Sequence, residues 1–118
     1  MVTAYVAAPL CAEAHGGRAG DVRVRVACLP PVERAGRFDL AQVGANARRA
    51  TEDSAAIAYV EQQGPAGRFS EPVVDSAGIA WIHSSSGASA MQRVLEAVEE
   101  SDSSSLRADV HESLGSGS

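Results

Sequence analysis

The sequence predicts a single α/β domain, because short apolar runs alternate with amphipathic stretches along a chain of 118 residues. Four apolar runs have the length and composition of buried strands: residues 3–10, 22–29, 55–60 and 79–82. Four amphipathic stretches have the spacing of helices: residues 40–50, 68–77, 89–100 and 106–114. This alternation favours three layers, with a parallel sheet between helices and right-handed crossovers between the strands. The length leaves room for one core.

Composition and charge narrow the classes of function. Hydrophobic residues make up 45% of the chain and aromatic residues 4%, so the core is expected to consist of Ala, Val, Ile and Leu. All ten basic residues are arginines, and the net charge is −5. The arginines are scattered along the sequence, which argues against nucleic-acid binding. No apolar run has the length of a membrane span, and the N-terminus lacks the pattern of a signal peptide.

The first two strands are expected to be neighbours in the sheet. Residues 3–10 are apolar on both faces, as in a buried parallel strand, whereas residues 22–29 alternate Val with Arg and then become apolar. Pro30 and Pro31 end the second strand. Only residues 11–21 connect the two strands, which is short for a parallel crossover. The connection is therefore either a tight loop or the site of a lost helix.

The first long helix begins after Asp39, which is a credible N-cap residue. Gly44 lowers its stability by up to ~1 kcal/mol relative to alanine, so packing must support it. Its expected buried face consists of Leu40, Val43, Ala47 and Ala50.

The next strand, residues 55–60, leads through a loop into the helix at residues 68–77. Gly78 stands where a glycine commonly follows a helix. The side chains expected to face inward from this helix are Phe69, Val73 and Val74.

The last two helices follow the fourth strand. The helix at residues 89–100 is expected to bury Met91, Val94, Leu95 and Val98. The final helix has Leu106, Val110 and Leu114 at a spacing of four. The single domain is therefore expected to span residues 2–114, with a disordered tail at residues 115–118.

Three serines, Ser84 to Ser86, lie between the fourth strand and the helix that follows it. Hydroxyl groups at a helix N-terminus after a strand can form an anion site in an open α/β sheet. The alternative is an ordinary serine-rich loop that caps the helix. His83 stands beside Ser84, but adjacent residues at a strand end point in opposite directions and no Gly-x-Ser-x-Gly motif is present. No catalytic residue is therefore expected.

Cysteine and histidine spacing leaves one structural alternative open. Cys11 and Cys28 follow the first strand and end the second, so they can form a disulfide if these strands are parallel neighbours. Two buried free thiols are the alternative, because no second pair indicates a disulfide framework. The three histidines share no metal-ligand spacing with the cysteines. Neither a metal nor a cofactor is therefore expected.

Several segments together resemble the type I periplasmic solute-binding proteins, the ligand-binding receptors of branched-chain amino-acid uptake. The resemblance covers residues 3–86 and includes Ala-Pro-Leu at the end of the first strand and Gly-Arg-Ala-Gly before the second. Residues 41–50 resemble the family's second helix. Residues 90–98 and 105–114 are similar to its C-terminal helix pair, although a whole second lobe separates these parts in the family. Here Gly87 and Ala88 join them directly.

The resemblance implies one lobe, built from an N-terminal segment at residues 2–86 and a helix pair at residues 89–114. It implies four parallel strands in the spatial order 2-1-3-4. In the family, the loops after the third and fourth strands hold the ligand. Carried over by position, the ligand-binding residues are Gln62, Gln63, Gly64, Ser84, Ser85 and Ser86.

The expected function is that of a non-enzymatic, solute-binding-protein-like domain that acts as a sensor or protein-interaction module. The alternative is a half-receptor of an ABC-type uptake system that binds an amino acid or another small carboxylate. The expected partners are a second copy of the chain and an amino-acid-like molecule. The resemblance implies a location outside the cytoplasm, whereas the missing signal peptide leaves a cytoplasmic location open.

Overall fold

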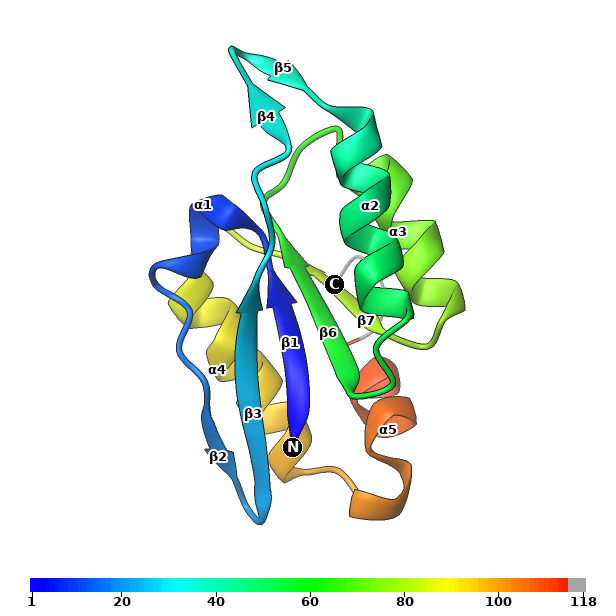
Figure 1. Ribbon diagram of the computed structural model, residues 1–118. Helices are drawn as coiled ribbons and strands as arrows, with labels where there is room; N and C mark the ends of the chain where they lie inside the picture. Colours follow the sequence, from blue (N-terminus) through cyan, green and yellow to red (C-terminus); the bar gives the residue numbers. More distant parts are fainter. Residues whose placement is uncertain (115–118) are drawn as a thin grey trace.

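The computed structural model describes residues 1–114, apart from the side chain of Ser103, and shows a mixed sheet with helices on both faces (Figure 1). The predicted disorder at residues 115–118 lies outside the described residues. The sheet has the strand order β2-β3-β1-β6-β7. These strands are β1 (Val2–Val6), β2 (Gly17–Ala19), β3 (Val22–Cys28), β6 (Ala56–Glu61) and β7 (Ala80–His83).

Each face of the sheet has its own hydrophobic cluster, and each cluster includes a pair of helices. The larger cluster packs the sheet against α4 (Gly87–Glu99) and α5 (Leu106–Leu114). The smaller cluster packs the other face against α2 (Leu40–Thr51) and α3 (Gly67–Ser76). A short 3-10 helix, Ser103–Ser105, connects α4 to α5. The three-layer α/β architecture was predicted, and the structure confirms it at this level.

The predicted four-stranded, all-parallel sheet is wrong in one respect. Strands β3, β1, β6 and β7 are parallel neighbours in the predicted order. A fifth strand, β2, pairs antiparallel with β3 at the edge and makes the sheet mixed. Gly20 and Asp21 form the turn between the two strands, and Gly20 has a φ of +62°. A two-residue hairpin turn favours such a residue, but a three-residue strand is too short to give a sequence pattern.

The first predicted strand, residues 3–10, is divided into two elements. It forms β1 and then the short helix α1 (Ala8–Cys11), with Pro9 in the first turn. Proline has no N–H for a central ladder but fits the start of a helix. The connection to β3 is therefore neither a bare loop nor a lost helix, because it contains α1 and β2.

The N-cap predicted for α2 is confirmed, since Asp39 Oδ1 accepts a hydrogen bond from the Gln42 N–H at 3.2 Å. Val43, Ala47 and Ala50 are buried as predicted. Leu40 was predicted to be buried but is 56% exposed. It begins the helix beside the unpredicted hairpin of β4 (Glu33–Arg34) and β5 (Arg37–Phe38), which projects beyond the sheet (Figure 1).

The inward face predicted for α3 is largely wrong. Val74 is fully buried, but Phe69 and Val73 are 52% and 44% exposed. The buried residues are Gly67, Ser70 and Val74, whose spacing of three and four places them on one helix face. Phe69 and Val73 therefore lie on the outer side. Gly78 follows the helix with a φ of +79°, as its predicted role requires.

The two C-terminal helices pack largely as predicted. Met91, Val94 and Val98 of α4 are buried, whereas Leu95 is only partly buried. Val110 and Leu114 of α5 are buried in the same cluster, and Leu106 packs at its margin. Within residues 1–114, none of the helices combines the length and apolar character that crossing a membrane requires.

Candidate functional site

The candidate site is a hollow of about 570 Å³ at the carboxyl ends of β6 and β7, called here the edge hollow. Its walls are Gln62, Gln63, His83, Ser84 and Ser85. Ligands of open α/β sheets commonly bind at this edge. Four of the six predicted ligand-binding residues therefore lie together, and His83 joins them.

Gly64 and Ser86, the other two predicted residues, do not line the edge hollow. Gly64 lines an adjoining hollow of about 310 Å³, which shares Gln63 and His83 with the edge hollow. Arg68 and Glu71 also line this second hollow. A ligand that spans the shared wall would therefore meet charged side chains as well as neutral hydrogen-bonding groups.

Strand register explains why the two loops meet. Glu61 at the end of β6 lies opposite His83 at the end of β7. The Ser84 N–H donates a hydrogen bond to the Glu61 carbonyl oxygen at 2.9 Å, which continues the parallel ladder by one residue. The residues after Glu61 and after His83 therefore leave the sheet side by side.

Residues 84–86, the serine loop, cap the N-terminus of α4. Ser84 Oγ donates to the Ser86 carbonyl at 2.9 Å and accepts from the Ser86 N–H at 3.1 Å. Ser86 Oγ accepts from the Ser89 N–H at 3.2 Å, as an N-cap residue does. The structure therefore contains the capping contacts of that alternative, and an anion site at this helix N-terminus stays a prediction. Ser85 is the exposed serine of the loop, and it lines the edge hollow.

A buried carboxyl group lies behind the edge hollow, and the sequence patterns did not indicate it. Glu61 is 5% exposed and accepts hydrogen bonds from Trp81 Nε1 at 2.6 Å and from Ser70 Oγ at 3.0 Å. Burial raises the pKa of this carboxyl, and the two hydrogen bonds only partly offset the effect. The available signal was an acidic residue at the end of the apolar run of β6.

Trp81 connects this network to the walls. Its ring lies 5.6 Å from the ring of His83, measured between centroids. On the other side it packs so closely on Gly67 that a Cβ atom there would lie 2.7 Å from Trp81 Cζ2. Glu61, Trp81 and Gly67 therefore join β6, β7 and the start of α3 into one support for the edge hollow.

Cys11 and Cys28 form a disulfide, with their Cα atoms 5.7 Å apart. Of the two alternatives left open by the sequence, the structure therefore contains the paired form. The disulfide ties α1 to the carboxyl end of β3. Gly87 of α4 packs against the Leu10 carbonyl of α1, so the disulfide, α1 and the start of α4 are in one packed group.

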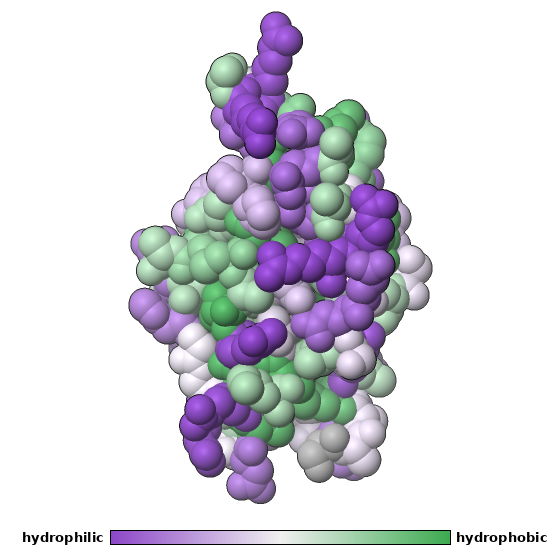
Figure 2. Space-filling view, viewed as in Figure 1, coloured by the Kyte–Doolittle hydropathy of each residue, from purple (hydrophilic) through white to green (hydrophobic). Residues whose placement is uncertain are grey.

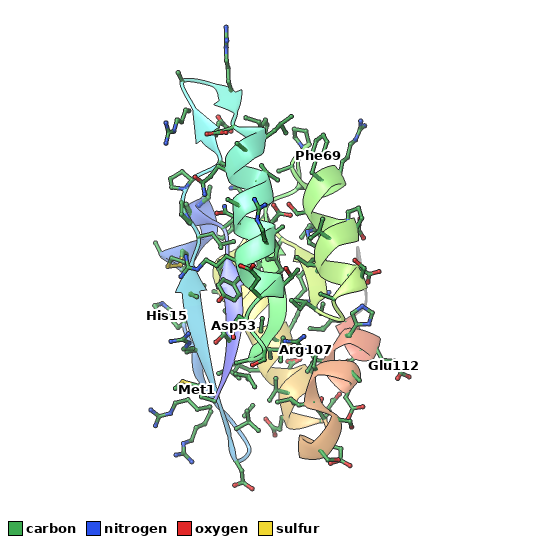
Figure 3. The ribbon with its side chains drawn as sticks, turned by 45° about the vertical axis from the view of Figure 1, so that its right-hand side comes forward. Met1, His15, Asp53, Phe69, Arg107 and Glu112 are labelled. Atoms are coloured by element: carbon green, nitrogen blue, oxygen red, sulfur yellow. A yellow bond between two sulfur atoms is a disulfide. The ribbon has the colours of Figure 1, made fainter. Side chains whose placement is uncertain are left out.

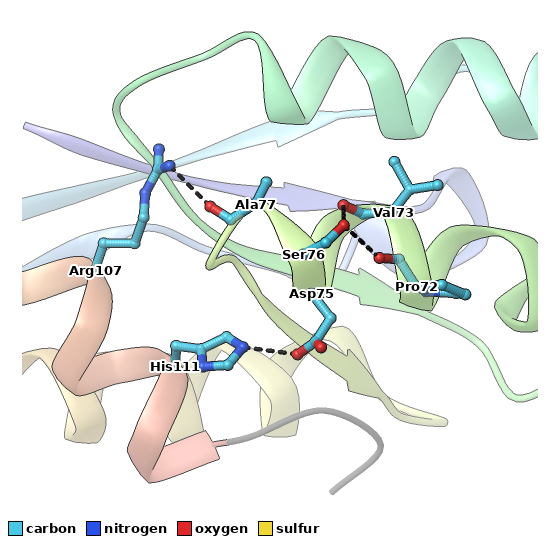
Figure 4. A network of polar contacts seen from close by, with 7 residues as sticks. All are labelled: Pro72, Val73, Asp75, Ser76, Ala77, Arg107 and His111. Atoms are coloured by element: carbon cyan, nitrogen blue, oxygen red, sulfur yellow. Dashed lines mark hydrogen bonds and ion pairs between the residues drawn. The ribbon is translucent and has the colours of Figure 1, made fainter.

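The histidines do not form a common site. His111 Nε2 lies 2.7 Å from Asp75 Oδ1 and links α5 to α3 (Figure 4). Arg107 strengthens the same junction, because its guanidinium donates to the Ala77 carbonyl at 3.3 Å (Figure 4). Within the described part of the chain, no three side chains of His, Cys, Asp or Glu gather as metal ligands do.

Comparison with known proteins does not assign the chain to a family. No protein-family model, no curated protein and no solved structure matches the chain. The resemblance to type I solute-binding proteins therefore stays a prediction. What the site can do follows from its own residues.

Proposed function

We propose that this domain is a non-enzymatic binding module of the sensor type, and that its edge hollow holds a small ligand bearing a carboxylate. The observation that carries the proposal is the convergence of hydrogen-bonding side chains from two loops at the carboxyl edge of the sheet. Gln62 and Gln63 are exposed, so their amide groups are available to a ligand. His83 and Ser85 contribute further polar groups.

The chemistry of the walls favours an anionic group. Amide N–H, hydroxyl and imidazole N–H groups all donate to carboxylate oxygens, and none of the residues lining the edge hollow is acidic. The lining of the adjoining hollow includes Arg68, whose charge suits a carboxylate, and Glu71, whose charge is opposite to that of an ammonium group. An amino acid, which carries both charges, is therefore the ligand class that we propose for the two hollows together.

The contacts of Ser84 and His83, the serine and histidine that are adjacent in sequence, support binding without catalysis. The Ser84 hydroxyl donates to the Ser86 carbonyl rather than to a general base. His83 stacks at an angle against Trp81, so its ring position is set by packing. These contacts favour a fixed wall over an activated serine.

Calorimetric titration with a panel of amino acids and small carboxylates tests the proposal. We expect saturable binding that Gln63→Ala and Ser85→Ala each weaken by roughly 3- to 10-fold, the usual range for one lost hydrogen bond. Gln92→Ala is the matched control, because Gln92 is exposed on α4 and lies outside both hollows. The proposal fails if no member of the panel binds, or if the control weakens binding equally.

A second candidate function is self-association, which a separate surface favours. Four of the five exposed large hydrophobic residues within residues 1–114 belong to β5, α2 and α3: Phe38, Leu40, Phe69 and Val73. Phe69 lies at the start of α3, on the side where α2 begins (Figure 3). Because α2 and α3 pack against each other, these exposed apolar side chains offer a surface for association. We propose a second copy of the chain as the partner.

Light scattering during size-exclusion chromatography tests this second candidate. A dimer should appear in wild-type protein and be lost in the double variant Phe69→Ser, Val73→Ser. Ala88→Ser, at an exposed position of α4, is the control. A wild-type monomer at all concentrations would contradict self-association without affecting the proposal for the edge hollow.

The proposed location is outside the cytoplasm. The disulfide between Cys11 and Cys28 supports it, because disulfides persist mainly in oxidising compartments.

A further inference from the structure

The β2–β3 hairpin gathers three arginines that are scattered in the sequence. Arg18 of β2 lies directly opposite Arg23 of β3. Arg25 follows two residues later on β3, so its side chain lies on the same face of the sheet as that of Arg23. All three are exposed, and hydrophilic side chains lie over this end of β2 and β3 (Figure 2).

These arginines line a hollow of about 660 Å³, called here the arginine hollow. Its lining also includes His15 and the backbone of Gly16 and Gly17, and no acidic residue belongs to it. Gly16 passes so close to the Val24 carbonyl oxygen that no side chain fits there. The loop before β2 is therefore held against β3, and its glycines leave the space between the arginines open.

Within residues 1–114, no carboxylate forms an ion pair with the arginines of the hollow. Arg25 Nε donates to Thr3 Oγ1 at 3.0 Å, which holds the guanidinium in place but leaves its charge. Asp21 lies in the hairpin turn, outside the lining of the hollow.

The carboxylate of Asp53, which interacts electrostatically with Arg25, already has hydrogen-bond donors. The hydrogen bond from Tyr5 has the largest part in lowering the pKa of Asp53, and the positive charge of Arg25 adds a smaller effect in the same direction. The Asp53 oxygens accept hydrogen bonds from Tyr5 Oη at 2.7 Å and from the Ala55 N–H at 2.9 Å. Arg49 is on the same side of the sheet and packs over the Tyr5 ring, with 5.5 Å from its Cζ to the ring centroid. On this side of the sheet Arg49 therefore adds positive charge, and the oxygens of Asp53 already accept hydrogen bonds. On the other side, His15 also lines a hollow that contains Glu13, Glu96 and Glu99.

The cluster lies in the basic part of the chain. Residues 14–50 contain seven arginines and three acidic residues, whereas residues 51–114 contain three arginines and eleven acidic residues. Like charges placed directly opposite each other on neighbouring strands are destabilising. An anion between the arginines would remove that repulsion.

We propose that the arginine hollow binds a tetrahedral oxyanion, namely a phosphate or sulfate group. Arginine is suited to this ligand because its planar fork of N–H donors matches two oxygens of such a group at once. Arg18 and Arg23 lie side by side on one face of the strand pair, so one anion can be shared between them. Arg25 lines the same hollow, although its Nε donates to Thr3 of β1 on the other side of β3. His15 lies on the same side of the protein, away from α5 (Figure 3), and supplies a further N–H donor.

Titration of ¹⁵N-labelled protein with inorganic phosphate, at constant ionic strength kept with sodium chloride, tests the proposal. We expect saturable shifts in the backbone amides of residues 15–25, with a Kd on the order of 1 mM for an open site. Arg23→Gln and Arg18→Gln should each weaken binding about 10-fold, the lower end for a charged hydrogen bond. Glycerol phosphate and sulfate, tested in the same way, distinguish a phosphate carried on a larger molecule from a free ion.

Arg37→Gln is the matched control. Arg37 lies directly opposite Arg34 in the β4–β5 hairpin, so it has the same like-charge arrangement, but it lies outside the lining of the arginine hollow. This hairpin lies at the opposite end of the protein from the β2–β3 turn (Figure 1). Binding that survives in Arg37→Gln and is lost in Arg23→Gln supports the proposal. Absence of saturable binding, or equal loss in the two variants, overturns it.

Discussion

The buried carboxyl of Glu61 makes the stability of this fold depend on pH, and Glu61→Gln isolates that dependence. Burial raises the pKa of the folded-state carboxyl above its ordinary value of 4.5. The protonated form is therefore favoured in the folded state. Its contribution to stability is fully present below the unfolded-state pKa and is lost as the pH rises through the folded-state pKa.

The size of the effect follows from one titrating proton. The free energy of unfolding falls by at most about 1.4 kcal/mol per pH unit between the two pKa values, and it becomes constant above the higher one. Glutamine keeps both hydrogen bonds of the site. Its amide oxygen can accept from Trp81 Nε1, and its amide group can donate to Ser70 Oγ, whose own hydrogen has the Ala66 carbonyl at 3.1 Å.

Urea unfolding between pH 4 and pH 8 measures the difference. We expect Glu61→Gln to match the wild type near pH 4 and to become progressively more stable than the wild type as the pH rises. Glu96→Gln, on the exposed face of α4, should show no such trend. The reasoning is refuted if the stability difference between Glu61→Gln and wild type is the same at every pH.

Three further predictions concern packing and cross-links. Gly67→Ala should lower the free energy of unfolding by about 1–3 kcal/mol, because the new Cβ would collide with the Trp81 ring. Gly44→Ala in α2 should raise it by up to about 1 kcal/mol, because there is open space around Gly44. Urea unfolding of both variants checks these opposite signs. In the double variant Cys11→Ser, Cys28→Ser the free energy of unfolding should fall by about 3 kcal/mol, as expected for a cross-link between residues 17 apart in sequence. Equal thermal unfolding of oxidised and reduced wild-type protein would contradict this. Arg107→Ala should lower the free energy of unfolding by about 2 kcal/mol, because the Arg107 guanidinium donates to the carbonyls of Asp53, Ser54 and Ala77. Hydrogen exchange should become faster at the α3–α5 junction in this variant. Unchanged exchange there would contradict a stabilising role of Arg107.

Long periodic segments were predictable because each carries its own signal. Asp39 accepts the hydrogen bond expected of an N-cap, and Gly78 has the positive φ that a glycine after a helix provides. The run at residues 3–10 was misread because apolar content alone does not separate a strand from a strand followed by a helical turn. Pro9 was the available signal, since a central strand excludes proline.

The site was predictable only where it follows the strand ends. Gln62, Gln63, Ser84 and Ser85 lie together because β6 and β7 are parallel neighbours, which the alternation of strands and helices had predicted. The ligand-binding role of Ser84 and Ser86 stays a prediction, and the capping bonds of their hydroxyls depend on a loop geometry that the sequence does not specify.

The arginine hollow could not be predicted from the sequence, because it depends on the antiparallel pairing of β2 with β3. A strand of three residues is too short to give a recognisable sequence pattern. Arg18 and Arg23 are opposite each other only in the register of β2 and β3. Without that strand the same arginines appear scattered. Their gathering is therefore a property of the tertiary structure rather than of the sequence pattern.

The side-chain amides of Gln62 and Gln63 provide the most direct test of the proposed ligand site. In ¹H–¹⁵N spectra recorded during titration with amino acids and small carboxylates, we expect these two amide pairs and the backbone of Ser85 to shift together and to saturate. The side-chain amides of Gln42, which donates to Asn46, and of Gln92 should not move. Shifts of equal size at all four glutamines, or none at Gln62 and Gln63 with any ligand, would contradict binding in the edge hollow.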